Sequence, residues 1–177
     1  MTTIGAQALT RDSFAPFGKV LSKPEASSDA EGPGWQWWGE VMALPTDGRR
    51  WAFGYLNLDP APMRIDWAER HLRSAEVVLA GGDIAVYVAP PTSTESPEPP
   101  APEAFRVFAL PAGSGVVMEP GVWHGAPFAM EDATSALVLL MEGTGREDVT
   151  VVRFPETPIV VEPRATRTDR IPTQVKG

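Results

Sequence analysis

Short runs of apolar, aromatic and β-branched residues alternate with glycine, proline and polar segments along most of the chain. Runs of this length and composition are typical of β-strands. The pattern predicts eleven strands, at Lys19–Ser22, Trp35–Leu44, Trp51–Leu58, Met63–His71, Glu76–Ala80, Ile84–Ala89, Phe105–Leu110, Gly115–Glu119, Thr134–Met141, Thr150–Phe154 and Ile159–Glu162.

The signals between these runs are mostly turn signals. Gly81-Gly82 separates two strand-like runs and predicts a tight hairpin turn. Helix is indicated only at Thr10–Phe14, where a capping residue begins a turn that Pro16 and Gly18 close. About eleven short strands with almost no helix predict an all-β sandwich or barrel.

Two segments fall outside the strand pattern. Residues 90–102 contain six prolines and no large apolar residue, which indicates an extended surface loop. This loop does not divide the chain, because neither half could close a sheet alone, so we expect one domain over residues 1–162. The tail, residues 163–177, is basic with little apolar content and is predicted to be disordered or packed on a partner chain.

Composition excludes several classes of protein. The chain of 177 residues has no cysteine, which excludes a disulfide framework, a thiolate zinc site and a cysteine nucleophile. Its net charge of -8 argues against nucleic acid as a partner. No apolar run reaches the roughly 18 residues of a membrane span, and the N-terminus lacks a signal-peptide pattern. We therefore expect a soluble cytoplasmic protein with no nucleic-acid or membrane partner.

The only two histidines have the most informative surroundings. Glu69 and His71 are two residues apart on a predicted strand, so their side chains share a face. A bulge or bend at Leu72–Ala75 would bring Glu76 to the same site. His124 follows a Pro-Gly turn and can complete the set from a neighbouring strand. These four imidazole and carboxylate donors suit nickel, manganese, iron or zinc without selecting one of them.

The spacing around the first histidine resembles the first motif of the cupin superfamily. Glu69 stands where that motif has its first His, His71 matches the second His, Glu76 matches the Glu, and Gly82 or Gly81 matches the closing Gly. The second motif is similar to the run Gly115–His124, whose adjacent Pro120 and Gly121 are one residue shorter than the cupin pattern. The two motifs in order imply a jelly-roll barrel.

The chain also resembles one family within that superfamily, the ureidoglycolate lyases. Its opening run Leu9–Val20, its Glu69-Arg70-His71 and its Gly121–Pro127 are similar to segments of that family, in the same order over about residues 9–142. The resemblance implies cleavage of ureidoglycolate to glyoxylate and urea in allantoin and purine degradation. It also implies a homodimer with a divalent cation, nickel being the metal associated with the family.

This reaction needs a base for the substrate hydroxyl and an acid for the departing urea nitrogen. We place Glu69, Glu76 and His124 at the reacting carbon as catalytic candidates, and either His124 or Glu76 could be the base. Arg73 is the better candidate to bind the substrate carboxylate, because Arg70 points away from His71 on an alternating strand. Trp37 is a further substrate-binding candidate.

Three departures from the family pattern leave the substrate open. Glu76 replaces the usual Gln, Met141–Gly145 replaces an Asp-Arg-Gly-Gly segment, and Trp35–Trp38 replaces a polar Asn-Asn-Gly region. The tryptophans could fill a core or a dimer seam, or line the pocket for a larger, more apolar ligand. The alternatives are therefore a paralogous cupin enzyme, a lyase, isomerase or hydrolase of another small carboxylated or aromatic metabolite, and a non-catalytic metabolite-binding cupin.

Overall fold

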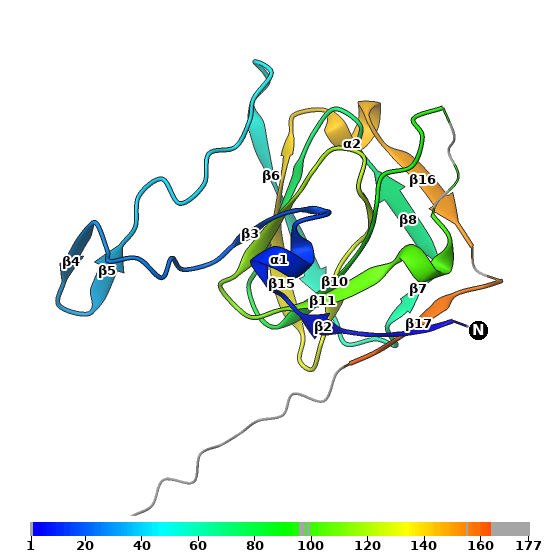
Figure 1. The fold of residues 1–177 in the computed structure, drawn as a ribbon, viewed down its shortest axis with the longest axis horizontal. Coiled ribbons are helices and arrows are strands. Elements are labelled where there is room, and N and C mark those ends of the chain that lie inside the picture. The colour runs from blue at the N-terminus through cyan, green and yellow to red at the C-terminus, as the bar shows by residue number, and fades with distance from the viewer. Residues whose placement is uncertain (1, 96–97, 99, 155, 164–177) are drawn as a thin grey trace, which may run out of the picture.

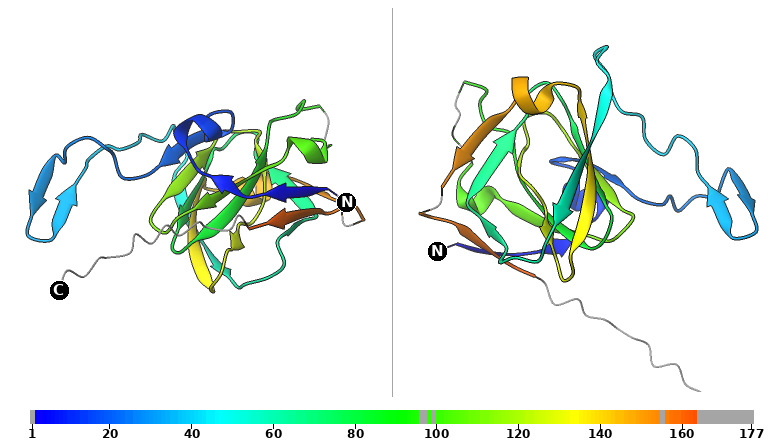
Figure 2. Two further views of the ribbon diagram at one scale, coloured as in Figure 1. Left: turned by 60° about the horizontal axis from the view of Figure 1, so that its bottom comes forward. Right: turned by 180° about the vertical axis from the view of Figure 1, so that it is seen from behind.

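The computed structural model describes residues 2–95, 98, 100–154 and 156–163. Two large β-sheets face each other, a small third sheet flanks one of them, and a hairpin projects from the body (Figures 1 and 2). The predicted all-β, jelly-roll type of fold is confirmed. Within the described residues the two large sheets remain separate and do not close into a continuous barrel.

The two large sheets are mostly antiparallel. The first sheet contains, in spatial order, β3 (Gly18–Leu21), β12 (Gly115–Met118), β9 (Glu76–Ala80), β15 (Thr134–Met141) and β6 (Trp51–Leu58). The second sheet contains, in spatial order, β16 (Thr150–Arg153), β8 (Trp67–Arg70), β13 (Trp123–His124), β10 (Ile84–Ala89), β11 (Arg106–Leu110) and β2 (Gln7–Ala8), with β14 (Phe128–Ala129) also paired to β10.

Smaller elements cover the edges and the outer face. The third sheet joins β1 (Thr3–Gly5), β17 (Ile159–Glu162) and β7 (Arg64–Ile65). The helices are single turns: α1 (Arg11–Phe14), the 3-10 turn η1 (Pro102–Ala104) and α2 (Thr144–Glu147). The predicted turn at Thr10–Phe14 is confirmed, because Thr10 and Ser13 cap it reciprocally. In the described part of the chain, no helix has the length and apolar character needed to cross a membrane.

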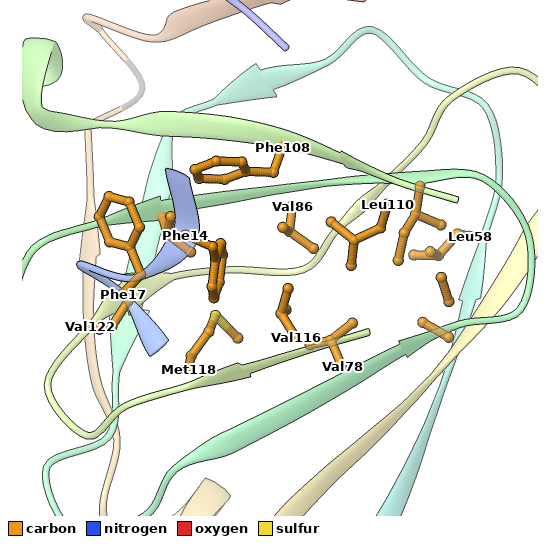
Figure 3. Packing of buried hydrophobic residues seen from close by; sticks show 14 of the residues in the cluster. Phe14, Phe17, Leu58, Val78, Val86, Phe108, Leu110, Val116, Met118 and Val122 are labelled. Atoms are coloured by element: carbon orange, nitrogen blue, oxygen red, sulfur yellow. The ribbon is translucent and has the colours of Figure 1, made fainter. Parts of the chain in front are cut away.

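The main core lies between the two large sheets, because alternate residues of each strand point inward. Val78 of β9 and Val116 of β12 face Val86 of β10 and Phe108 of β11 (Figure 3). Phe14 from α1 closes one end of this layer, with its ring centroid 5.2 Å from that of Phe108. A second apolar cluster covers the outer face of the second sheet, and its largest members are Tyr87, Phe105 and Trp123.

The run Trp35–Leu44 was predicted to be one long strand, and this is wrong. Only Trp35–Trp37 is a strand, β5, which pairs with β4 (Ala30–Gly32) in the projecting hairpin (Figure 1). Trp35 and Trp37 are 53% and 60% exposed, so these tryptophans do not fill a core of their own chain. The predicted tail lies outside the described residues except for Pro163.

The predicted hairpin at Gly81-Gly82 is also wrong. β9 pairs with β12 and β15 in the first sheet, whereas β10 pairs in the second sheet, so these glycines carry the chain from one sheet to the other. The chain passes very close to β15 there: a Cβ atom on Gly81 would lie 2.7 Å from the Ser135 carbonyl oxygen. The glycine pair is needed for this close approach, and not for a two-residue turn.

We predict that Gly81→Ala lowers the free energy of unfolding by about 1–3 kcal/mol, because the added methyl group must displace backbone of β15. Gly5→Ala is the matched control, since a Cβ atom there meets nothing within 4 Å, and it should change stability by less than about 0.5 kcal/mol. Urea unfolding of both variants measures the difference. Equal stabilities of the two variants would show that the segment between the two sheets tolerates a side chain at position 81.

Candidate active site

The candidate site lies between the two large sheets, and each sheet contributes polar residues to it. Glu69 of β8 and His124 of β13 are directly opposite each other in the second sheet. His71 follows β8, and Glu76 begins β9 in the first sheet. The predicted bend at Leu72–Ala75 is confirmed, because this segment carries the chain between the sheets.

Strand alternation places these side chains on the inner face. Ala68 belongs to the outer apolar cluster, so Glu69 and His71 point the other way, as the sequence predicts. The outward position of Arg70 is also confirmed: its guanidinium stacks on Trp123, with Cζ 4.6 Å from the ring centroid. On this outer face Thr92 Oγ1 accepts hydrogen bonds from both Arg70 and Trp123, which fixes the first part of the proline-rich loop against the second sheet.

Both imidazole rings have one nitrogen bound to the backbone. His71 Nδ1 is 2.8 Å from the carbonyl oxygen of Asp148, and His124 Nδ1 is 2.9 Å from that of Val122. A carbonyl oxygen can only accept, so each Nδ1 carries the proton and donates it. The neutral form of each ring therefore has its lone pair on Nε2, the usual position for binding a metal.

The two Nε2 atoms converge on one carboxylate oxygen. Glu76 Oε2 is 3.1 Å from His124 Nε2 and 3.3 Å from His71 Nε2. Burial raises the pKa of Glu76, but the charge and hydrogen bond of His124, together with the nearby His71 ring, outweigh burial and lower that pKa to about 2. Burial lowers the pKa of His124, but the Glu76 carboxylate and the Val122 carbonyl raise that pKa to about 9. The protein without a cation therefore holds an ion pair between Glu76 and His124.

Glu69, His71 and His124 could hold a metal ion together. One potential ligand atom from each lies within 4.8 Å of the other two. His71 Nε2 is buried and makes no well-aligned hydrogen bond with a described residue; its polar neighbour is the Glu76 carboxylate, 3.3 Å away. The donor set therefore fits a divalent cation. Of the four predicted ligands, three form this cluster, while Glu76 contacts the two rings.

A fifth residue, Asp148, was not found by sequence reasoning. Its carboxylate accepts hydrogen bonds from the backbone amides of Leu72 and Arg73, at 3.0 and 2.8 Å, while its carbonyl holds His71. Asp148 therefore fixes both the bend and the first imidazole ring. It follows α2, 77 residues beyond His71, and no local pattern in the sequence marks it.

The two predicted substrate-binding residues do not join this cluster. The Arg73 guanidinium donates to the carbonyl of Glu147, at 2.8 Å, and lies 3.6 Å from the Asp148 carboxylate, so it connects the bend to α2. Trp37 lies on the projecting hairpin, away from β8 (Figure 1). Trp123 is fully buried.

A pair of facing β-sheets with two histidines and carboxylates between them defines a cupin-like protein. The profile of the ureidoglycolate lyase family matches residues 1–162, so the chain belongs to that family. It is 29% identical to a ureidoglycolate lyase of Azotobacter vinelandii over 152 residues, covering 82% of this chain and 89% of that one. It is 28% identical to ureidoglycolate lyase 2 of Rhizobium meliloti, covering 82% and 90%.

Two solved sugar isomerases are more distantly similar. A dTDP sugar isomerase from Desulfovibrio desulfuricans aligns with a TM-score of 0.41 and 18% identity, covering 79% of this chain and 86% of that one. The 3,4-ketoisomerase QdtA from Thermoanaerobacterium thermosaccharolyticum also gives 0.41, with 16% identity, covering 55% of this chain and 64% of that one in its TDP complex. At these TM-scores neither similarity bears on the activity of this chain.

Proposed function

We propose that this protein cleaves ureidoglycolate to glyoxylate and urea, a reaction of allantoin and purine degradation. The observation that carries the proposal is the family match over residues 1–162, which includes every residue of the inner cluster. The cluster supports it chemically, because it combines a candidate cation site with a buried carboxylate that can exchange protons.

The reaction moves one proton and breaks one bond. The substrate carbon bears a hydroxyl group, a carboxylate and the ureido nitrogen. Loss of the hydroxyl proton forms the carbonyl of glyoxylate, the carbon–nitrogen electrons leave with the nitrogen, and that nitrogen takes up a proton as urea. The site must therefore accept a proton at the hydroxyl and supply one at the nitrogen.

The proposed cation ligands are Glu69, His71 and His124. A divalent cation bound there would supply a positive charge that favours ionisation of the substrate hydroxyl. Nickel is the metal that the family resemblance implies, and manganese, iron and zinc suit the same donors. Because Nδ1 of each ring is bound to a backbone carbonyl, a ring that ligates through Nε2 has no nitrogen left to act as a base.

This argument assigns proton transfer to Glu76. Its carboxylate contacts both rings, lies outside the three-residue ligand set and is almost completely buried. In our proposal Glu76 accepts the hydroxyl proton and returns it to the departing nitrogen. The usual Gln of the family cannot carry a proton, so this role is particular to a chain with Glu at the position.

We predict that protein purified without chelator or histidine tag contains nearly one divalent metal ion per chain. His71→Gln and His124→Gln should each lose the metal, whereas Glu131→Gln, at an exposed loop position, should retain it. Elemental mass spectrometry measures the metal content per protein chain. A folded wild-type protein without metal would overturn the proposed site.

The same site predicts the pH dependence of metal binding. The pKa of about 9 means that His124 holds a proton on Nε2 at neutral pH in the cation-free protein. The cation must displace this proton, so its affinity should fall about tenfold for each unit that the pH is lowered below 9. Titrations at pH 8 and pH 6 measure the slope, and equal affinities would exclude His124 as a ligand.

We predict glyoxylate release from ureidoglycolate by the metal-loaded protein. Glu76→Gln should lower kcat by about 10²–10⁴-fold while the metal content is unchanged, because the amide cannot transfer the proton. A Glu76→Gln variant as active as the wild type would remove Glu76 from proton transfer. Absence of turnover by the metal-loaded wild type would overturn the function itself.

One alternative function follows from a departure of the sequence from the family pattern. Glu76 adds a negative charge where the family usually has a neutral Gln, which disfavours an anionic substrate. A paralogous enzyme for another small metabolite is therefore the second candidate. The case for an aromatic ligand is weaker, because the hairpin holds Trp35 and Trp37 apart from the cluster (Figure 1).

We also propose that the protein is a homodimer, as the family resemblance implies. The outer side of the first sheet exposes an apolar row, in which Tyr55 of β6 lies directly opposite Leu137 of β15 and Phe53 lies opposite Leu139. Phe53 and Tyr55 are 71% and 69% exposed, and β6 is the last strand of its sheet. A second copy would cover both these rings and the free strand edge.

Light scattering on the protein as it elutes from a size-exclusion column should give the mass of two chains. Replacing Phe53 and Tyr55 together by Asp should give a folded monomer, because the substitutions place charge on an exposed apolar face. A monomeric wild type, or a variant that stays dimeric, would contradict an interface at this face.

A further inference from the structure

The inner face of the second sheet continues from Glu69, one of the candidate metal ligands, to the neighbouring strand β16. Val151 lies directly opposite Glu69, and Arg153 lies opposite Trp67, in antiparallel register. Opposed residues share a face of a sheet, so Val151 and Arg153 are on the same face as Glu69. Their neighbours agree with this assignment, because Val152 and Phe154 pack against the outer apolar cluster.

Arg153 is close enough to Glu69 for both side chains to contact the same small ligand. It is the diagonal neighbour of Glu69 across the β8–β16 pair, a relation that separates the two backbones by about 7–8 Å and lies within reach of a long side chain. Arg153 is exposed, and Val151 is 45% exposed. The inner face of the second sheet therefore opens to solvent beside Glu69.

The inner face of the first sheet also borders a cavity, at the end where α2 lies. A cavity of about 420 Å³ is lined by Ala52, Gly54, Val138 and Leu140, together with residues of α2. These four positions alternate with the exposed outer row of β6 and β15, so they belong to the inner face of the first sheet. A small ligand can thus reach the inner face of the first sheet beside α2. The residues that line this cavity do not include β8 or β16, and Arg153 lies at the end of β16 away from α2, opposite Trp67.

Three other arginines near this opening have partners, whereas Arg146 of α2, which lines the cavity, makes no side-chain hydrogen bond or ion pair with another described residue. Arg70 is held on the outer face by Thr92 and Trp123, and Arg73 is held by Glu147 and Asp148. Arg50 forms an ion pair with Glu142. Arg153 makes no hydrogen bond or ion pair with another described residue, so its guanidinium is available to a ligand.

We propose that Arg153 binds the carboxylate of the substrate, at the end of a site that begins at Glu69, His71 and His124. The inference rests on the proposed function, which supplies a substrate with one carboxylate. A guanidinium matches a carboxylate with two parallel hydrogen bonds, and Val151, directly opposite Glu69 and two residues before Arg153, is an apolar neighbour of both on this face. Arg153 thus replaces Arg73 as the residue that orients the substrate.

The test compares three single variants of the metal-loaded full chain. Arg153→Gln should raise KM for ureidoglycolate about 10- to 100-fold, the effect of losing a charged hydrogen-bonded pair, and change kcat much less. Arg153→Lys should recover part of the loss. Arg64→Gln on β7 of the third sheet is the matched control, and Arg146→Gln of α2 tests the other arginine that lines the cavity.

Calorimetric titration with glyoxylate separates this inference from the proposed function. Glyoxylate keeps the carboxylate, so Arg153→Gln should weaken its binding by a similar factor while Arg64→Gln and Arg146→Gln bind as the wild type does. That result supports the role of Arg153 even if ureidoglycolate is not turned over. Unchanged glyoxylate binding by Arg153→Gln, a loss confined to Arg146→Gln, or no binding by the wild type would each overturn it.

Discussion

The hydrogen bond from each histidine Nδ1 to a backbone carbonyl is the constraint on which the site depends. It fixes the tautomer of both rings, and it leaves Nε2 as the only nitrogen that can meet a proton, a carboxylate or a cation. The two carbonyls belong to Val122 and Asp148, from different parts of the chain. Their positions are therefore as important to the chemistry as the imidazoles.

Those carbonyls are held by interactions on both sides of the second sheet. Inside, the Asp148 carboxylate binds the backbone amides that follow His71, so one residue orients the ring and fixes the bend next to it. Outside, Trp123 is stacked by Arg70 and donates a hydrogen bond to Thr92. Arg70 and Trp123 are the chain neighbours of Glu69 and His124. Their packing on the outer face therefore maintains the strand register that places Glu69 opposite His124 on the inner face.

The parts of the fold that depend on local pattern could be predicted from the sequence. The run Thr134–Met141 is a strand with the predicted bounds, and the four inner polar residues were found because the two histidines stand in recognisable motifs. Features that depend on distant residues could not be predicted. Gly81-Gly82 carries a common turn signal, but the pairing partners of β9 and β10 place them in different sheets. Asp148 contacts His71, and Arg153 shares the face of Glu69, only because α2 contacts the bend and β16 pairs with β8.

The charge balance of the cluster links Glu76 to Arg153. In the proposed site, a divalent cation with two ionised carboxylates and two neutral imidazoles would have no net charge, since +2 − 2 = 0, whereas a Gln at position 76 would leave one positive charge. A neutral cluster attracts a substrate carboxylate less than a positive one does. A chain with Glu76 therefore needs a cation elsewhere in the site to hold an anionic substrate, and Arg153 is the unpaired guanidinium on the same face as Glu69 in the described part of the chain. The proton transfer proposed for Glu76 and the carboxylate binding proposed for Arg153 are then two parts of one electrostatic arrangement.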